Sequence, residues 1–187
     1  MNALQLKMAT LEYWRFKEQC PMVALEASCT LRAFKDGGAA DVLAVTKTRL
    51  LIETEVKLTL SDLRRDSEKP KHIYFKQGLQ LSLGSSALPS PSIYPTSLFY
   101  FAIPFELRGE AIQICEHLYP YAGVLLVDRY GEAMGDCCVH SQWRRPQRLS
   151  TTKLTGLQLM RMAREQSATL CRLARQAVLL AEGDERE

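Results

Sequence analysis

Two neighbouring apolar runs constrain the fold of this chain more than any other feature of its sequence. Residues 41–46 (DVLAVT) and 50–58 (LLIETEVKL) are rich in Leu, Ile and Val, which favours β-strands. Only a short polar connection separates them, so we predict that they pair as an antiparallel hairpin. In such a hairpin the start of the first strand lies beside the end of the second. Residues 41 and 55 are therefore expected to be neighbours.

The rest of the chain alternates between helical and strand-like patterns. Apolar spacing predicts helices at residues 4–20, 105–118 and about 151–180, and a short charged helix capped by Ser61. Strands are predicted at residues 23–31, 98–103 and 123–128, a surface loop at 80–96, and a basic loop at 142–147. The order strand, helix, strand after residue 98 implies a parallel crossover. The predicted fold class is therefore α/β, with a mixed sheet flanked by helices.

The length of 187 residues and the 47% hydrophobic content predict one domain with its own core. We assign residues 1–150 to this domain and residues 151–187 to a C-terminal helix and tail that pack on it. The apolar residues expected to face the core from this segment are Leu154, Leu157, Leu170, Leu173 and Ala177. The same spacing would also allow the helix to pack on a second copy, as in a homodimer.

Charge and composition restrict the classes of partner. The net charge of +3 permits a nucleic-acid partner without requiring one. No run reaches the roughly 18 apolar residues of a membrane helix, and the first residues do not form a secretory signal. The six cysteines are scattered and fit a reducing compartment. We therefore expect a cytoplasmic protein without a membrane partner.

The second strand of the hairpin carries an unusual set of ionisable residues. Because strand side chains alternate between faces, Glu53, Glu55 and Lys57 are expected on one face, with successive positions about 6.6 Å apart. Burying such groups without partners is costly. Either this face is open to water, as in a surface strand of mixed charge, or the acids bind a metal ion.

The metal interpretation adds Asp41, which the hairpin places near Glu55. Two carboxylates are a typical protein contribution to a Mg²⁺ site that water and substrate phosphate complete. Such an ion can bind a phosphodiester and lower the pKa of a bound water. Lys57 can stabilise the negative charge that develops during hydrolysis. This pattern predicts a nuclease that uses Mg²⁺ or Mn²⁺.

At these positions the chain resembles the PD-(D/E)xK nuclease superfamily. Asp41 is followed after thirteen residues by Glu55-Val56-Lys57, with Ala40 in place of the usual Pro. The chain is also similar to a small bacterial and phage group of MmcB-like DNA-repair proteins over roughly residues 10–132. The similar segments are residues 40–45 (ADVLAV), 51–57 (LIETEVK), 61–66 (SDLRRD), 99–104 (FYFAIP) and 122–128 (AGVLLVD). Leu63 stands where that group has an aromatic residue.

The resemblance implies a restriction-endonuclease-like fold and metal-dependent cleavage of DNA in repair or phage DNA metabolism. It implies that Asp41 and Glu55 are metal ligands and that Lys57 is the catalytic lysine. The superfamily often adds a further glutamate, for which Glu12, Glu18 and Glu26 are candidates. The alternative is a catalytically silent nuclease fold that binds nucleic acid within a larger complex.

Two basic segments are candidate DNA contacts. Arg64 and Arg65 follow the Glu-x-Lys strand, and Arg144 and Arg145 follow Trp143, which is a candidate for base stacking. The alternative is a solvated helix face in the first case and a basic loop anchored by the Trp in the second. His72 is expected at the surface, although it could also reach a phosphate bound at the nuclease site.

Overall fold

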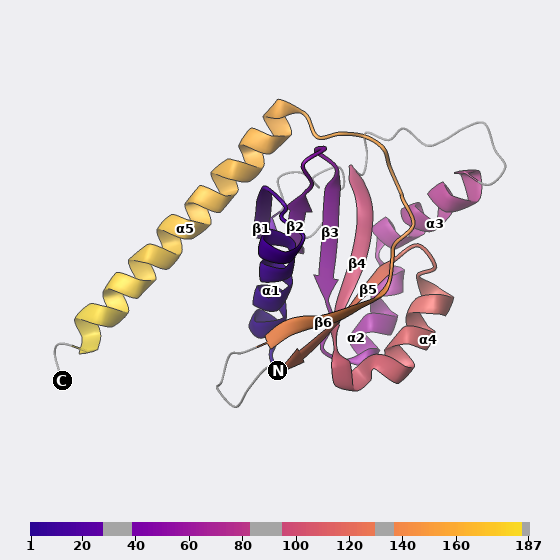
Figure 1. The fold of residues 1–187 in the computed structure, drawn as a ribbon, viewed down its shortest axis with the longest axis horizontal. Helices are drawn as coiled ribbons and strands as arrows, with labels where there is room; N and C mark the ends of the chain where they lie inside the picture. The colour runs from indigo at the N-terminus through magenta and orange to yellow at the C-terminus, as the bar shows by residue number, and fades with distance from the viewer. Residues whose placement is uncertain (28–38, 83–94, 130–136, 185–187) are drawn as a thin grey trace.

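A six-stranded mixed sheet forms the centre of the computed structural model, which describes residues 1–27, 39–82, 95–129 and 137–184 (Figure 1). The strands lie side by side in chain order, β1-β2-β3-β4-β5-β6. Their bounds are Met22–Ala27, Ala40–Val45, Leu51–Val56, Thr96–Pro104, Gly123–Arg129 and Cys137–Arg144. Strands β3, β4 and β5 are parallel to one another, and the other neighbours are antiparallel. The predicted hairpin and parallel crossover are therefore both confirmed.

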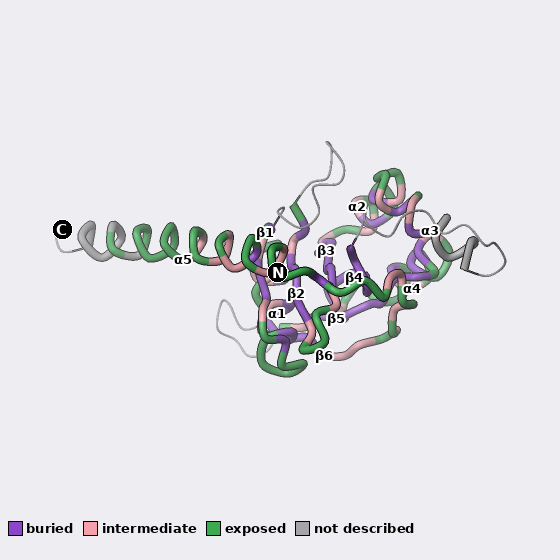
Figure 2. Tube along the Cα trace, turned by 90° about the horizontal axis from the view of Figure 1, so that it is seen from above, coloured by how far each residue is buried: buried purple, intermediate pink, exposed green. Residues whose placement is uncertain are grey.

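Helices cover the two faces of this sheet (Figure 2). The α-helices are α1 (Ala3–Glu12), α2 (Leu60–Arg65), α3 (Pro70–Ser82), α4 (Arg108–Leu118) and α5 (Gly156–Asp184). The shorter turns are η1 (Tyr13–Lys17), η2 (Asp66–Glu68) and η3 (Phe105–Leu107). Helix α1 packs on one face, whereas α2, α3 and α4 pack on the other. The predicted α/β class, a mixed sheet flanked by helices with a long C-terminal helix, is confirmed.

The face under α1 is an apolar core. Leu6 and Trp14 are buried against strand residues such as Val42 and Ile52. The indole nitrogen of Trp14 donates a hydrogen bond of 3.0 Å to the Thr54 hydroxyl, so the polar end of this ring is satisfied. Not every apolar residue of α1 faces the sheet, because Leu4 and Met8 are 63% and 40% exposed.

The face under α2, α3 and α4 is rich in aromatic residues. The strand residues Phe99 and Phe101 are fully buried there, together with Tyr119 and Tyr121 from the segment between α4 and β5. Their rings meet edge to face, with centroids of Phe101 and Tyr119 4.7 Å apart. Such contacts stabilise a core beyond simple area burial.

Strand β6 corrects the prediction of a basic loop at residues 142–147. The strand extends to Arg144, and its pairing with β5 has two irregularities, at which His140 and Trp143 have no partner in the register. Extra residues of this kind disrupt the alternation of buried and exposed side chains. The sequence pattern of a strand is therefore lost in this segment.

Helix α5 begins at Gly156, about five residues later than predicted, with the Thr155 hydroxyl accepting a bond from the Gln158 N–H. It packs on β1 near its start, through the buried Met162, and runs away from the rest of the chain (Figures 1 and 2). Leu154 is buried but precedes the helix. Leu157, Leu170 and Leu173 are exposed, so their predicted core positions are wrong. The Ala177 side chain lies outside the described residues.

Candidate active site

The acidic residues of β3 and the lysine that follows the strand lie on the face covered by α3. Glu53, Glu55 and Lys57 are 0%, 5% and 4% exposed. The Lys57 N–H donates to the Ala102 carbonyl at 3.0 Å, which extends the pairing with β4 by one residue and fixes the backbone there. As alternation predicts, the three side chains share a face, but that face is buried rather than open to water.

Lys71, from the first turn of α3, joins two of these acids. Its ammonium donates to Glu53 Oε1 at 2.8 Å and to Glu55 Oε1 at 2.6 Å. The second oxygen of Glu53 accepts a bond of 2.7 Å from the Thr96 hydroxyl. Burial alone would lower the pKa of Lys71, but the two carboxylates outweigh it and raise that pKa above its ordinary value. The ammonium is therefore firmly charged.

Lys57 has a different main partner, Asp66. Its ammonium lies 2.7 Å from Asp66 Oδ1 and 3.6 Å from Glu55 Oε2. Lys69 makes a similar pair of contacts, at 2.5 Å to Asp66 and 3.6 Å to Glu55. Burial would raise the pKa of Glu55, but the ammonium groups of Lys71, Lys69 and Lys57 together lower it. These lysines and the carboxylates of Glu53, Glu55 and Asp66 form a charge-balanced group that we call the charge cluster.

Asp41 lies at the start of β2, beside the end of β3. Its Oδ2 accepts a hydrogen bond of 2.9 Å from the Val56 N–H, and its Oδ1 lies 2.9 Å from the Lys7 ammonium of α1. Helix α1 covers the opposite face from α3. The structure therefore brings Asp41 next to the Glu55-Val56-Lys57 segment but binds its carboxylate to Lys7, whereas the Glu55 carboxylate is bound to lysines of the other face.

The candidate glutamates for completing the site are placed differently from one another. Glu26 pairs with Lys7 at 3.0 Å and is thereby linked to Asp41. Glu12 and Glu18 are exposed. Of the three candidates, Glu26 is the one that shares a cation with Asp41.

The donor set can be compared with the needs of Mg²⁺ or Mn²⁺. Within residues 1–27, 39–82, 95–129 and 137–184, no group of three or more His, Cys, Asp or Glu side chains is arranged to hold a metal ion. Glu53 and Glu55 do converge on one cation, the Lys71 ammonium. Because Mg²⁺ commonly takes only one or two carboxylates and completes its shell with water and phosphate, this pair fits such an ion. A metal ion there would compete with Lys71.

The arginines predicted to contact DNA differ in their availability. Arg64 and Arg65 are exposed and pair with Glu110 and Asp62 at 3.6 and 3.1 Å. Asp62 is in turn 3.7 Å from the Lys57 ammonium, so Arg65 borders the charge cluster. Their long exposed side chains remain able to exchange these partners for phosphate.

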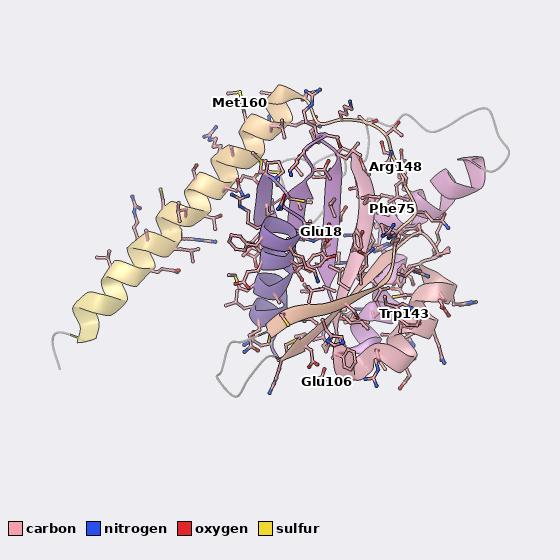
Figure 3. All side chains as sticks on the ribbon, in the orientation of Figure 1. Glu18, Phe75, Glu106, Trp143, Arg148 and Met160 are labelled. Atoms are coloured by element: carbon pink, nitrogen blue, oxygen red, sulfur yellow. The ribbon has the colours of Figure 1, made fainter. Side chains whose placement is uncertain are left out.

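Arg144 has a structural role in the described fold. Its guanidinium donates to the carbonyls of Tyr119, Ala122 and Cys115 at 2.7, 2.8 and 3.2 Å, which satisfies the end of α4. Arg145 is exposed, and Trp143, which lies in β6, is 55% exposed (Figure 3). Of the predicted set at this segment, Trp143 and Arg145 are exposed, whereas Arg144 is partly buried.

Sequence reasoning missed Asp66, Lys69 and Lys71, and its expectation for His72 was wrong, because this residue is fully buried. These residues come from η2 and α3, which fold back over the end of β3. The sequence contains a local signal in Asp66 and Pro70, which mark the breaks between short helices. No periodicity of one strand, however, identifies which lysines of a later helix will reach its acids.

Comparison with known proteins supports the fold and leaves the activity open. The chain matches no known protein family and no curated protein. It is similar to the solved structure of SPO1766, a protein of unknown function from Silicibacter pomeroyi, with a TM-score of 0.56 and 15% identity. The similarity covers 98% of this chain and 94% of the other. Within the described residues, no helix is long and apolar enough to cross a membrane. Because the identity is only 15%, this similarity shows a shared fold and nothing about activity.

Proposed function

We propose that the protein is a nuclease that hydrolyses DNA phosphodiester bonds with Mg²⁺ or Mn²⁺. The observation that carries the proposal is the bond of 2.9 Å between the Asp41 carboxylate and the Val56 N–H. It anchors the acid at the start of β2 to the backbone between Glu55 and Lys57. The spacing of the Asp and Glu-x-Lys residues in the sequence thereby corresponds to neighbours in space.

Glu55 is the proposed central metal ligand because it belongs to two alternative pairs. One pair is Glu55 with Asp41, as the sequence motif implies, and it would require the Asp41 carboxylate to leave Lys7 on the other face. The other pair is Glu55 with Glu53, and oxygens of these two acids already converge on one cation. A bound ion would supply a site for the scissile phosphate and an acidified water. Lys57 supplies a fixed ammonium beside Glu55, suited to stabilising negative charge on the phosphate. The exposed Arg64 and Arg65 would hold the DNA backbone at the edge of the site.

Cleavage assays on supercoiled, linear and single-stranded DNA test this function, each with Mg²⁺, Mn²⁺ or EDTA. We expect metal-dependent cutting that is lost in Lys57→Met and Glu55→Gln. Asp41→Asn and Glu53→Gln identify which acid shares the ion with Glu55. The exposed Lys47, which bonds Gln19 away from the charge cluster, provides the control Lys47→Met. Cutting that persists in both Lys57→Met and Glu55→Gln would rule the site out.

One observation favours a second function, a catalytically silent module that binds nucleic acid. The Lys71 ammonium occupies the point on which Glu53 and Glu55 converge. A protein that has replaced its metal ion by a lysine would bind DNA without cutting it. Binding should weaken with salt, and Arg65→Gln and Arg145→Gln should each reduce the slope of log K against log salt by about 1. Intact DNA under every metal condition, with this salt-dependent binding retained, would favour the silent module.

A further inference from the structure

A continuous chain of buried hydrogen bonds runs from Lys57 into the aromatic core. Lys57 Nζ is 2.7 Å from Asp66 Oδ1, and Asp66 Oδ2 is 2.6 Å from His72 Nε2. The other ring nitrogen of His72, Nδ1, is 2.5 Å from the Tyr121 hydroxyl. None of these four residues is more than 4% exposed. The chain therefore connects the proposed catalytic lysine to two groups on the far side of Asp66.

The protonation states give these bonds one direction. Burial would raise the pKa of Asp66, but its bonds with His72 and Lys57 outweigh this and place that pKa well below the ordinary range. Burial lowers the pKa of His72 despite its carboxylate partner, so the ring is neutral at neutral pH. Burial also raises the pKa of Tyr121, which keeps its proton. Tyr121 thus donates to His72 Nδ1, and His72 Nε2–H donates to Asp66.

Packing holds the members of this chain in single orientations. The His72 ring stacks on Phe101, with centroids 5.8 Å apart and an interplanar angle of 26°. Phe99 meets it edge to face at 5.1 Å. In this orientation the Nε2–H of His72 is directed at Asp66. The carboxylate of Asp66 is in turn bound at both oxygens, and its Oδ1, which Lys69 shares, is the closest acceptor of the Lys57 ammonium.

We propose that Asp66, His72 and Tyr121 are positioning residues that hold the Lys57 ammonium beside Glu55. This inference rests on the proposed function, since it assigns these residues to the orientation of the proposed catalytic lysine. A polar chain inside an aromatic core is costly unless every bond is made. Apolar side chains of the same shape would suffice for stability alone. The hydrogen bonds from Tyr121 through His72 and Asp66 end on Lys57, where they can hold its ammonium in one position.

The protein contains a matched control for Tyr121, the last residue of this chain of hydrogen bonds. Tyr121 and Tyr119 are both fully buried in the same aromatic core. The Tyr119 hydroxyl donates to the Leu63 carbonyl at 2.5 Å and does not belong to the bond chain described here. Tyr121→Phe and Tyr119→Phe therefore each remove one buried hydroxyl and keep the ring. Only the first shortens the chain that ends on Lys57.

The kinetic arm compares DNA cleavage by these variants and by His72→Gln. We expect His72→Gln and Tyr121→Phe to lower kcat roughly 10- to 100-fold with KM unchanged, the range seen when groups that orient an active-site residue are removed. Tyr119→Phe should keep kcat within about twofold of wild type while lowering the melting temperature comparably. Equal kcat in the two tyrosine variants would overturn the positioning role.

The second experiment uses NMR to observe the chain of hydrogen bonds directly, so it does not depend on DNA cleavage. In ¹H–¹⁵N spectra, a Lys57 ammonium held by Asp66 should exchange its protons slowly enough to be seen, with Lys57→Met assigning the signal. The His72 ring should carry its proton on Nε2. We expect the Lys57 signal to persist in Tyr119→Phe and to shift or broaden in His72→Gln and Tyr121→Phe. A Lys57 signal unaffected by both, or a proton on Nδ1, would overturn the proposal even if wild-type protein cleaves DNA. Conversely, intact DNA with the expected spectra would reject the nuclease while retaining the positioned lysine.

Discussion

Two lysines, one on each face of the sheet, bind a pair of carboxylates in similar geometry and in very different surroundings. Lys7 of α1 lies 3.0 and 2.9 Å from Glu26 and Asp41. Lys71 of α3 lies 2.8 and 2.6 Å from Glu53 and Glu55. The side chains of Glu26 and Asp41 are 61% and 21% exposed, whereas those of Glu53 and Glu55 are 0% and 6% exposed.

The difference lies in what each carboxylate loses when its lysine is removed. Water can solvate Glu26 and part of Asp41, so Lys7 contributes little that solvent cannot replace. Glu53 and Glu55 are buried away from water, and among the residues that the structure describes their partners are the lysines and Thr96. A similar bond length therefore indicates a similar geometry but not a similar energy. Low polarity also strengthens every charge interaction of the buried pair.

Removing each ammonium in turn tests whether burial makes Lys71 contribute more stability than Lys7. We expect Lys71→Met to lower the free energy of unfolding by about 3–5 kcal/mol, because it leaves buried carboxylates without their closest cation. Lys7→Met should cost about 0–1 kcal/mol. Urea unfolding followed by circular dichroism measures both at the same pH. Equal losses would show that exposure does not separate the two pairs.

A second pair of substitutions extends the contrast from carboxylates to backbone carbonyls. Arg144 binds three carbonyls near the end of α4, while its neighbour Arg145 is exposed. Arg144→Met should cost about 1.5–3 kcal/mol, typical of a hydrogen bond to a charged group, and Arg145→Met less than about 0.5 kcal/mol. For DNA binding we expect the reverse order of effect. The same unfolding assay with a salt titration of DNA binding tests both, and a stable Arg144→Met would contradict the structural role.

The sheet near the candidate site could be predicted from local pattern, because the information is local. Alternation along β3 placed Glu53, Glu55 and Lys57 on one face, and the short connection before β3 fixed the hairpin. The partners that these three side chains contact could not be predicted. Lys71 and His72 reach the site from α3, which follows the short helices α2 and η2. Nothing in the sequence of β3 specifies how α3 folds back over that strand.

Long-range geometry also explains the failures at the ends of the chain. Strand β6 was missed because two pairing irregularities interrupt its alternation. The face of α5 was misassigned because an amphipathic pattern predicts an apolar stripe without indicating what covers it. Met162 is buried on β1, whereas Leu170, on the outer part of the same helix, is 68% exposed. Periodicity identifies the helix, and only the tertiary structure shows where its packing stops.

The smallest expected effect concerns pH and again separates the two faces. Burial lowers the pKa of His72 in the folded protein below the ordinary value of about 6.5. Below pH 6.5 the unfolded chain therefore takes up a proton that the folded protein excludes, so stability is lost as the pH falls toward the folded pKa. On the other face, the contact with Lys7 lowers the pKa of Glu26. Burial would lower the pKa of Lys7, but Asp41 and Glu26 raise it. Glu26 and Lys7 therefore both stay charged between pH 6.5 and 5.

We accordingly expect the free energy of unfolding to fall between pH 6.5 and 5, with His72 contributing a slope of at most about 1.4 kcal/mol per pH unit. The slope should become shallower in His72→Gln, which removes the proton uptake, and should be unchanged in Lys7→Met, which alters the other face. NMR titration of the ring protons follows the protonation of His72 itself. An identical slope in wild type and His72→Gln would mean that the buried ring takes up its proton without cost. That result would remove the neutral imidazole on which the directed bond from His72 to Asp66 depends.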